Sequence, residues 1–299
     1  MRVFITGASG WIGSHTVDEF LAAGHEVLGL ARSDASAATL EAKGAEVLRG
    51  DLDDLDSLRE GAASTDGTVH LANKHDFANP AVSNAAERAA VQTIADTLEG
   101  SGRPFLVASG HAGIVEGRAV TEDDVNPHVG PDAMRGGSER LALDYADRGV
   151  RAIAARFAPT VHGAGDHGFV AALVAGARAA GQSGYVGDGS NEWSAVHVTD
   201  AARAVRLAVE GAPAGTRLHV VAEEGIATRD IATAIGEGLG LPVVPVDPAE
   251  ATTRIGWIGF FFGMHLAATS DKTRALLGWH PNGPTLADDL PSYLSAPTA

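Results

Sequence analysis

The sequence predicts an α/β protein with a doubly wound parallel sheet. Short apolar stretches rich in β-branched residues alternate with amphipathic stretches over the first half of the chain, which is typical of parallel strands joined by helices. A glycine-rich turn directly follows the first apolar stretch. No segment of roughly 20 to 50 residues repeats, so a solenoid is excluded.

The first expected strand is RVFITG, Arg2 to Gly7, and an apolar periodicity of about 3.6 residues from Trp11 to Ala23 predicts the helix after it. The same alternation continues to about residue 163. Further strands are expected at 25–32, 45–52, 67–72, 103–110 and 150–163, and further helices at 35–43, 55–62, 84–98 and 138–147.

The second half of the chain interleaves with the first. A helix is expected at 169–180, a strand leading into a helix at 195–210, a strand at 217–223, and a helix at 228–240 with Thr228 as its N-cap. We expect residues 1–162 and about 196–222 to form one domain around the parallel sheet. Residues from about 163–195 and 223–299 should form a small discontinuous lobe that binds a substrate.

The composition indicates a globular protein that acts on small molecules. The chain has 299 residues, 45% of them hydrophobic, which is enough for a large core. Its 38 acidic and 22 basic residues give a net charge of -16, which argues against nucleic-acid binding because phosphate contacts need a basic face. The absence of cysteine excludes disulfides, thiolate metal sites and a cysteine nucleophile.

The N-terminus MRVFITGASG has no leader pattern, so the cytoplasm is the expected location. The longest apolar run, Ile255 to Ala268, is too short to cross a membrane and is interrupted by glycines and a histidine. We expect this run to be buried or to face the substrate. A homodimer contact on its outer side is left open, and no membrane partner is expected.

The turn TGASGWIG places glycines at positions 7, 10 and 13 between a strand and a helix. Gly7 permits a tight turn, Gly10 lets the backbone approach a pyrophosphate, and Gly13 allows the helix to pack on the strand, while the helix N-terminus attracts negative charge. The other cofactor-binding residues expected in this turn are Ser9, Trp11 and Ile12. The domain is therefore predicted to be Rossmann-type and to bind a dinucleotide.

The end of the second strand, LARSD, indicates which dinucleotide is bound. An acidic residue there would accept hydrogen bonds from a ribose 2′-hydroxyl and repel a 2′-phosphate. Arg32 and Ser33 occupy this place and can both bind a phosphate, whereas Asp34 is one or two residues late for the ribose. NADP, as NADPH, is the predicted cofactor; the alternative for Arg32 is an exposed surface cation.

With these motifs the sequence resembles the extended or atypical short-chain dehydrogenase/reductases. The matching motifs follow the family's order and are spread over the first two thirds of the chain. They are TGASGWIG, GDLDD at 50–54, VHLA at 69–72, VASG at 107–110, RFAPTVHG at 156–163 and VHVTDAARA at 196–204. The set is far more specific than any single motif in it.

The resemblance implies three groups of cofactor-binding residues beyond the glycine turn. Asp51 and Leu52 would meet the adenine. The path of the nicotinamide ribose would be lined by Leu71, Ala72 and Asn73, and the nicotinamide would be flanked by Pro159, Val161 and His162.

The resemblance fails at the helix that follows the fifth strand. Ser109 falls where the family keeps its catalytic serine or threonine, and active members also carry YxxxK on the next helix, where the lysine lowers the pKa of the tyrosine and holds the ribose. Here Arg135 falls on the lysine position, with Glu139 after it, and Pro131 on the tyrosine position. Arg135 is expected to hold the ribose, but a guanidinium is a poor proton donor.

Another group, or water, must then supply the proton. The candidates are Lys74, His75 and Asp76 after the fourth strand, His111, His128 and His162 on later loops, and Tyr185 in the lobe. Histidine titrates near neutrality and is suited to this role, although a solvated or capping histidine is the alternative for each. Tyr145 and Tyr293 are expected to lie far from the site.

Two other site types fit these residues less well. His162, Asp166 and His167 share a glycine-rich loop, but the stretch matches the family's substrate-side loop and has no further ligands nearby, so no metal is expected. A hydrolase triad built on Ser109 and His111 would lack the GxSxG elbow and leave the dinucleotide turn unused.

The leading hypothesis is an NADP-dependent oxidoreductase that transfers hydride to a carbonyl, imine or activated alkene of an apolar small molecule, with Ser109 polarising the substrate. One alternative is a catalytically silent dinucleotide-binding sensor or scaffold protein. A second is an epimerase or dehydratase of the sugar-nucleotide type, which usually depends on the missing tyrosine.

Overall fold

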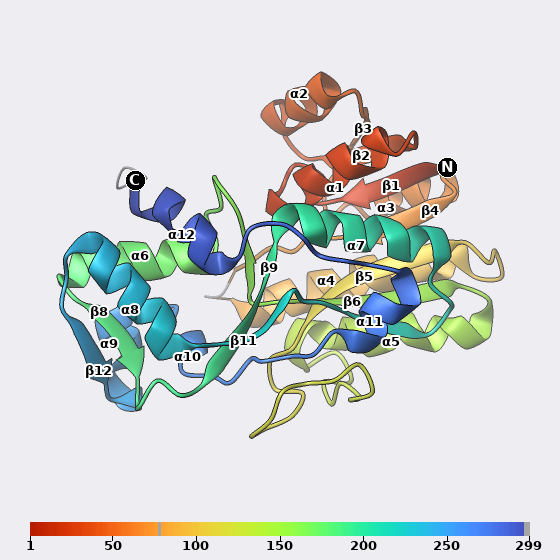
Figure 1. The fold of residues 1–299 in the computed structure, drawn as a ribbon. Helices are drawn as coiled ribbons and strands as arrows, with labels where there is room; N and C mark the ends of the chain where they lie inside the picture. Colours follow the sequence, from red (N-terminus) through yellow and green to blue (C-terminus); the bar gives the residue numbers. More distant parts are fainter. Residues whose placement is uncertain (77–78, 296–299) are drawn as a thin grey trace.

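The computed structural model describes residues 1–76 and 79–295, and its centre is a seven-stranded, fully parallel sheet (Figure 1). The strand order is β10-β6-β5-β4-β1-β2-β3, so the order reverses at β1. The strands are β1 (Arg2–Thr6), β2 (Glu26–Ala31), β3 (Glu46–Arg49), β4 (Gly67–His70), β5 (Pro104–Gly110), β6 (Arg151–Phe157) and β10 (Thr216–Val220). The predicted Rossmann-type α/β class is confirmed.

Helices cover both faces of this sheet. One layer contains α1 (Trp11–Ala22) and α7 (Val198–Gly211), which pack on each other, and the other contains α3 (Leu55–Ala63), α4 (Pro80–Leu98) and α5 (Ser138–Asp144). Helix α2 (Asp34–Lys43) joins β2 to β3.

The alternation of side chains along β1 explains the two layers. Val3 and Ile5 join the apolar core beneath α1 and α7, whereas Phe4 joins the separate core beneath α3 and α4. Successive side chains of a strand point to opposite faces, so an entirely apolar strand must be covered on both sides. The continuous apolar strands of the sequence are therefore buried strands.

The expected strand at 150–163 is wrong as a single element. It is divided into β6 and β7 (Thr160–His162), with Ala158 and Pro159 between them. Proline has no N–H to donate to a sheet ladder, which is consistent with the interruption at this point. Instead of extending the main sheet, β7 pairs in parallel with β9 (Glu192–His197), which pairs antiparallel with β11 (Glu223–Ala227).

The remaining elements lie at one side of the sheet and share an apolar core of their own (Figure 1). They are α6 (Phe169–Ala180), β8 (Ser183–Val186), α8 (Thr228–Leu239), β12 (Val243–Val246), α9 (Ala251–Ile255), α10 (Gly259–Phe262) and α12 (Leu286–Ser295). Strand β8 pairs in parallel with β12. Helix α11 (Asp271–Leu277) instead packs against α7 and β10. We refer to the elements that share this separate core as the lobe.

Smaller predictions about element boundaries needed correction. The helix expected at 138–147 ends at Asp144 and continues as a 3-10 turn over Tyr145–Arg148. Thr228 is the first helical residue of α8, and the N-cap is Ala227; the hydroxyl of Thr228 donates to Oδ1 of Asn191 at 2.8 Å. Within residues 1–76 and 79–295, no helix has both the length and the apolar character needed to cross a membrane.

Candidate functional site

The turn between β1 and α1 is shaped for a close-lying anion. Gly7 has a φ of +68°, and a Cβ there would lie 2.7 Å from the backbone nitrogen of Ala72. A Cβ on Gly13 would lie 2.0 Å from the carbonyl oxygen of Gly7, so α1 can approach β1 only with glycine at this position. No side chain caps α1 at Gly10, and its first turn has no acidic residue. The geometry fits the pyrophosphate of a dinucleotide.

The loop after β4 lies against this turn. The backbone nitrogens of Leu71 and Ala72 donate to the carbonyl and the hydroxyl of Thr6, at 3.2 and 3.3 Å. On the other side, Nε1 of Trp11 donates to the carbonyl of Val161 in β7 at 2.7 Å. The structure therefore brings together the loop after β1, the loop after β4 and β7, which carry three of the predicted groups of cofactor-binding residues.

The end of β2, where the adenosine of the cofactor is expected, lies beside a second basic residue, Arg49, that the sequence analysis does not predict. Arg32 is exposed, while the Ser33 hydroxyl caps α2 by accepting from the nitrogen of Ser36. Asp34 forms an ion pair at 2.9 Å with Arg49, which ends the neighbouring strand β3 in register with Ala31. The carboxylate of Asp34, which would repel a 2′-phosphate, is thus paired with the guanidinium of Arg49.

Lys74 is held at the same end of the site. Its Nζ lies 2.8 and 2.7 Å from the two carboxylate oxygens of Asp53, in the loop after β3. In that loop, Oδ1 of Asp51 accepts from the backbone nitrogens of Asp53 and Asp54, and Leu52 is buried. Lys74 therefore joins two loops as an ion-pair partner, which argues against its predicted role as the proton donor.

The site contains a buried carboxylate that the sequence analysis does not predict, Glu87 of α4. Its side chain is fully buried; Oε1 accepts from Nη2 of Arg135 at 2.6 Å, and Oε2 accepts from Nδ2 of Asn73 at 3.1 Å. Nε2 of His70 lies 3.8 Å from Oε2. Burial by itself would raise the pKa of Glu87, but Arg135 and His70 outweigh it and lower that pKa to about 2.

The sequence contained a signal for Glu87. The buried positions of α4 form a stripe with helical spacing, and Glu87 occupies one of them among Ser83, Ala90, Val91 and Ile94. A carboxylate on the apolar stripe of a helix requires a buried partner, because an unpaired buried charge is very costly. The stripe could therefore have identified Glu87, although not its partner.

Arg135 and His75 share an unusual backbone conformation. Within the described ranges they are the two non-glycine residues with positive φ, at 53° and 51° respectively. Gly136 and Gly137, which follow Arg135, are also left-handed, and the nitrogen of His75 donates to Oδ1 of Asn73 at 2.8 Å. His75 is exposed overall, but partial burial of its imidazole, followed by the charge of Arg135, lowers the pKa of His75. Strained backbone of this kind is often found at functional sites.

Ser109 belongs to a second buried network. Its hydroxyl donates to Oε2 of Glu139 at 2.6 Å, and the same oxygen accepts from Nδ2 of Asn126 at 3.0 Å. Nη2 of Arg156 donates to Oε1 of Glu139 at 2.6 Å. Burial alone would raise the pKa of Glu139, but Arg156 outweighs it and lowers that pKa. Because a serine has one hydroxyl proton, this arrangement leaves none for polarising a substrate.

Two candidate proton donors on the loop after β5 are also engaged or buried. The ring of His111 is buried and packs edge-on against His219, with ring centroids 4.6 Å apart. Burial, followed by the charges of His219 and Arg156, lowers the pKa of His111 well below its ordinary value. His111 is therefore neutral at ordinary pH. The other candidate, His128, has its Nε2 3.1 Å from the carbonyl oxygen of Ala112.

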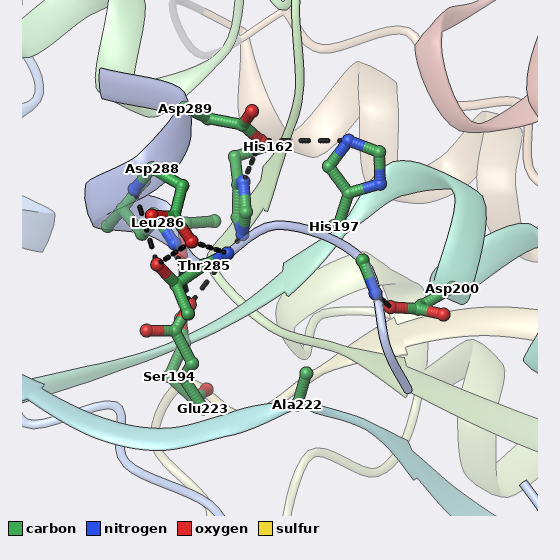
Figure 2. Close-up of polar contacts among 12 residues, drawn as sticks. His162, Ser194, His197, Asp200, Ala222, Glu223, Thr285, Leu286, Asp288 and Asp289 are labelled. Carbon is green, nitrogen blue, oxygen red and sulfur yellow. Dashed lines mark hydrogen bonds and ion pairs between the residues drawn. The ribbon is translucent and has the colours of Figure 1, made fainter. Parts of the chain in front are cut away.

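His162 contacts the C-terminal helix, α12, as Figure 2 shows. Its Nδ1 lies 2.7 Å from Oδ2 of Asp289 in α12, and the same oxygen lies 3.6 Å from Nε2 of His197. The nitrogen of Leu286 donates to Oε2 of Glu223 at 2.8 Å (Figure 2). The beginning of α12 is thus fixed onto β7, β9 and β11, and the ring of His162 is fully buried.

The expectation for Tyr293 is wrong. Its hydroxyl donates to Oδ2 of Asp166 at 2.8 Å and accepts from the nitrogen of Gly163 at 3.2 Å, so α12 holds the loop at 163–168 that follows β7. Tyr145 lies elsewhere, with its hydroxyl bonded to Asp96 and Gln92 of α4.

Tyr185 lies within the lobe, in β8. Its ring faces the guanidinium of Arg229, 5.1 Å from the ring centroid, and packs beside Gly189. Strand β8 lies at the end of the lobe away from β5 (Figure 1). This position argues against the predicted role of Tyr185 as a substitute acid. Pro159, by contrast, lies between β6 and β7, next to the strand of Val161.

Comparison with known proteins agrees with this geometry. The model of the NAD dependent epimerase/dehydratase family matches residues 3–221. The uncharacterized protein YLL056C of Saccharomyces cerevisiae is 42% identical over 296 residues, which cover 97% of this chain and 98% of the yeast protein. A 4-hydroxy-2-methyl-3-oxo-4-farnesyl-3,4-dihydroquinoline-1-oxide ketoreductase of Stigmatella aurantiaca is 25% identical over 308 residues, covering 93% of this chain and 92% of that protein.

Among solved structures, a double mutant of DesIV, the dTDP-glucose 4,6-dehydratase of Streptomyces venezuelae, with NAD and DAU bound, is similar in fold. Its TM-score is 0.78 at 22% identity, and the match covers 98% of this chain and 96% of that one. This chain therefore belongs to the NAD dependent epimerase/dehydratase family, in agreement with the resemblance to the extended short-chain dehydrogenase/reductases.

Proposed function

We propose that this chain is an NADP-dependent reductase that transfers hydride to a carbonyl, imine or activated alkene of an apolar small molecule. The observation that carries the proposal is the ion pair between Arg135 and the buried Glu87, which lies beside His75. Arg135 occupies the position where the family resemblance expects a lysine that holds the ribose. The name of the Stigmatella ketoreductase supports reduction as the direction of the reaction.

The preference for NADP is supported by the end of β2. Arg32 is exposed and Arg49 is the last residue of the adjacent strand β3, so two guanidinium groups flank the expected position of a 2′-phosphate. Asp34, which would repel that phosphate, is paired with Arg49. Ser33 contributes less than expected, because its hydroxyl proton is donated to the hydroxyl of Ser36 at 3.0 Å.

Residues of this chain would hold the cofactor and supply the proton that the reaction needs. The glycine turn at 7–13 binds the pyrophosphate, and Arg135, fixed by Glu87, binds the nicotinamide ribose. A bound reduced nicotinamide supplies the hydride to the substrate carbon. In carbonyl reduction the oxygen must then gain one proton to give an alcohol, and the protein or water must provide it.

His75 is the side chain best suited to provide that proton. Arg135 keeps its own proton, Lys74 is paired with Asp53, and His111 is buried and neutral. His75 lies close enough to Arg135 and Glu87 for both charges to act on its pKa. We therefore assign His75 as the donor for carbonyl substrates. An iminium substrate is already protonated and needs no donor.

One observation favours a second candidate function. The hydroxyl proton of Ser109 is donated to Glu139, and Pro131 occupies the usual tyrosine position. A site that lacks both the serine hydroxyl proton and the tyrosine as donors can bind a dinucleotide without catalysing a reaction, as a sensor does.

The test is to measure oxidation of NADPH and NADH by the purified protein with ketones, cyclic imines and activated alkenes. Oxidation of NADPH with at least one class supports the reductase. Tight NADPH binding without oxidation on the whole panel would instead support the sensor.

A further inference from the structure

Four aromatic side chains of the lobe form a contiguous group, which we call the aromatic cluster: Phe169, Trp257, Phe260 and Phe261. Phe169, at the start of α6, stacks on Phe261 with ring centroids 5.6 Å apart and meets Trp257 edge-on at 5.7 Å. Phe260 meets Phe261 edge-on at 5.3 Å. The cluster thus joins α6 to α10 and the turn before it.

The aromatic cluster lies next to the proposed reaction site. His167, two residues before Phe169, is edge-on to Trp11 of the glycine turn at 6.5 Å, and its charge acts on His75. The loop at 163–168 therefore extends from the cofactor turn to the cluster. On the other side, Ala112, three residues beyond Ser109, packs against the same apolar core as Phe169 and Phe261.

The cluster is more exposed than a structural core requires. Trp257 is 47% exposed and Phe260 is 64% exposed, while Ile258 and Phe262 of the same segment are buried and contribute to the core of the lobe. A group of exposed aromatic side chains commonly marks a surface that binds an apolar ligand.

The basic residues of the lobe and of the adjoining helix α11 argue against a nucleoside-diphosphate sugar as that ligand. A diphosphate needs cationic donors, but every lysine and arginine side chain of residues 163–195 and 223–295 already donates to a group of this chain. The pairs are Arg178 with Leu294, Arg229 with Asp188, Arg254 with Glu250, Lys272 with Asp123, and Arg274 with Ser270 and Ala222.

We infer that the aromatic cluster is the substrate wall of the site and that it selects an uncharged, flat aromatic carbonyl compound. The inference rests on the proposed function for the reaction. The substrate would stack on Trp257 and meet Phe261 edge-on, because these two ring planes are 80° apart, with its carbonyl toward His75. Its carbonyl carbon gains the hydride of NADPH, its oxygen gains a proton, and NADPH is oxidised to NADP⁺.

The test uses a matched pair of probes with NADP⁺ or NADPH present. 2-Naphthamide is uncharged, flat and not reducible, and 2-acetonaphthone is its reducible counterpart. We expect 2-naphthamide to quench tryptophan fluorescence in the wild type. In Trp257→Phe the quench should be largely lost while the calorimetric affinity is kept, which locates the ligand at this ring.

Trp257→Ala should weaken 2-naphthamide binding and raise KM for 2-acetonaphthone, each by roughly tenfold. Leu276→Ala, a control that truncates an apolar side chain 48% exposed on α11, should change neither value. Thermal unfolding of all variants checks that they remain folded.

Several results would overturn the inference. UDP-glucose binding in preference to 2-naphthamide would do so, as would equal effects of Trp257→Ala and Leu276→Ala. A dimer in sedimentation that Trp257→Ala dissociates, with unchanged 2-naphthamide affinity, would make the cluster a subunit contact.

The two proposals fail in different ways. If 2-naphthamide binds at Trp257 but NADPH is never oxidised, the ligand class stands and the reductase falls. If only aliphatic ketones are reduced, the reductase stands and the aromatic wall falls.

Discussion

Nη2 of Arg135 donates to Oε1 of Glu87 at 2.6 Å, and the accepting carboxylate is fully buried while the guanidinium remains partly exposed. Removing one partner of such a pair leaves an uncompensated charge. We predict that Arg135→Met lowers the free energy of unfolding by up to about 3 kcal/mol and also weakens NADPH binding.

The double variant Arg135→Met with Glu87→Gln is the matched control. It should recover much of the lost stability in urea unfolding, because no unpaired carboxylate remains, but it should not recover NADPH affinity. Unchanged affinity in Arg135→Met would show that Arg135 does not contact the cofactor.

The same pair predicts how stability depends on pH. The pKa of Glu87 is lowered from 4.5 to about 2 in the folded protein, so its contribution to stability is fully present above pH 4.5. That contribution is lost as the pH falls through about 2. The unfolding free energy of the wild type should therefore decrease over this range, and Glu87→Gln should decrease less steeply. Parallel curves for the two proteins in acid unfolding would contradict the assignment.

Cofactor preference is predicted from Arg32 and Arg49. Arg32→Asp should weaken NADPH binding and leave NADH affinity the same or higher, because the new carboxylate repels a 2′-phosphate and can accept from a ribose hydroxyl. Arg49→Ala should weaken NADPH binding less. Titration calorimetry measures both, with Arg59→Asp on α3 as a control for net charge. Equal wild-type affinities for the two cofactors would remove the basis of the prediction.

Ser109 should contribute to stability more than to turnover. Ser109→Ala removes a hydrogen bond to the Glu139 carboxylate, which commonly costs about 1.5 to 3 kcal/mol. NADPH affinity should not change, and the fall in turnover should stay below about tenfold. A fall of about a hundredfold, typical when an oriented donor is lost, would show that the hydroxyl turns toward the substrate during the reaction.

The features that sequence reasoning identified correctly are those fixed by local rules. The turn at 7–13 was found because positive φ and close packing require glycine whatever surrounds them. Helix α6 was placed at its observed bounds, 169–180, because its apolar spacing is regular. The interruption at Pro159 also has a local cause, because proline has no N–H to donate to a sheet ladder.

The features that sequence reasoning missed depend on contacts between distant segments. Glu87 and Arg135 are 48 positions apart, and Tyr293 reaches Asp166 over 127 positions. Neither contact is encoded in a local pattern of the sequence. The absence of the catalytic tyrosine is evident from the sequence, but the ion pair between Arg135 and Glu87 can be identified only from the fold.

The last prediction concerns His75 and the pH dependence of reduction. Burial and the charge of Arg135 lower the pKa of His75 below 6.5, so its imidazolium form becomes abundant only at more acidic pH. With carbonyl substrates, kcat/KM should rise as the pH falls toward and below this pKa, because the protonated ring is the donor. His75→Gln should remove this acidic rise, whereas His128→Gln, a control on another loop, should keep it. Reduction of a cyclic iminium ion should show no such rise in any of the three proteins. A pH profile for ketone reduction that is the same in wild type and His75→Gln would show that the proton comes from elsewhere, and water would then be the donor to test by solvent isotope effects.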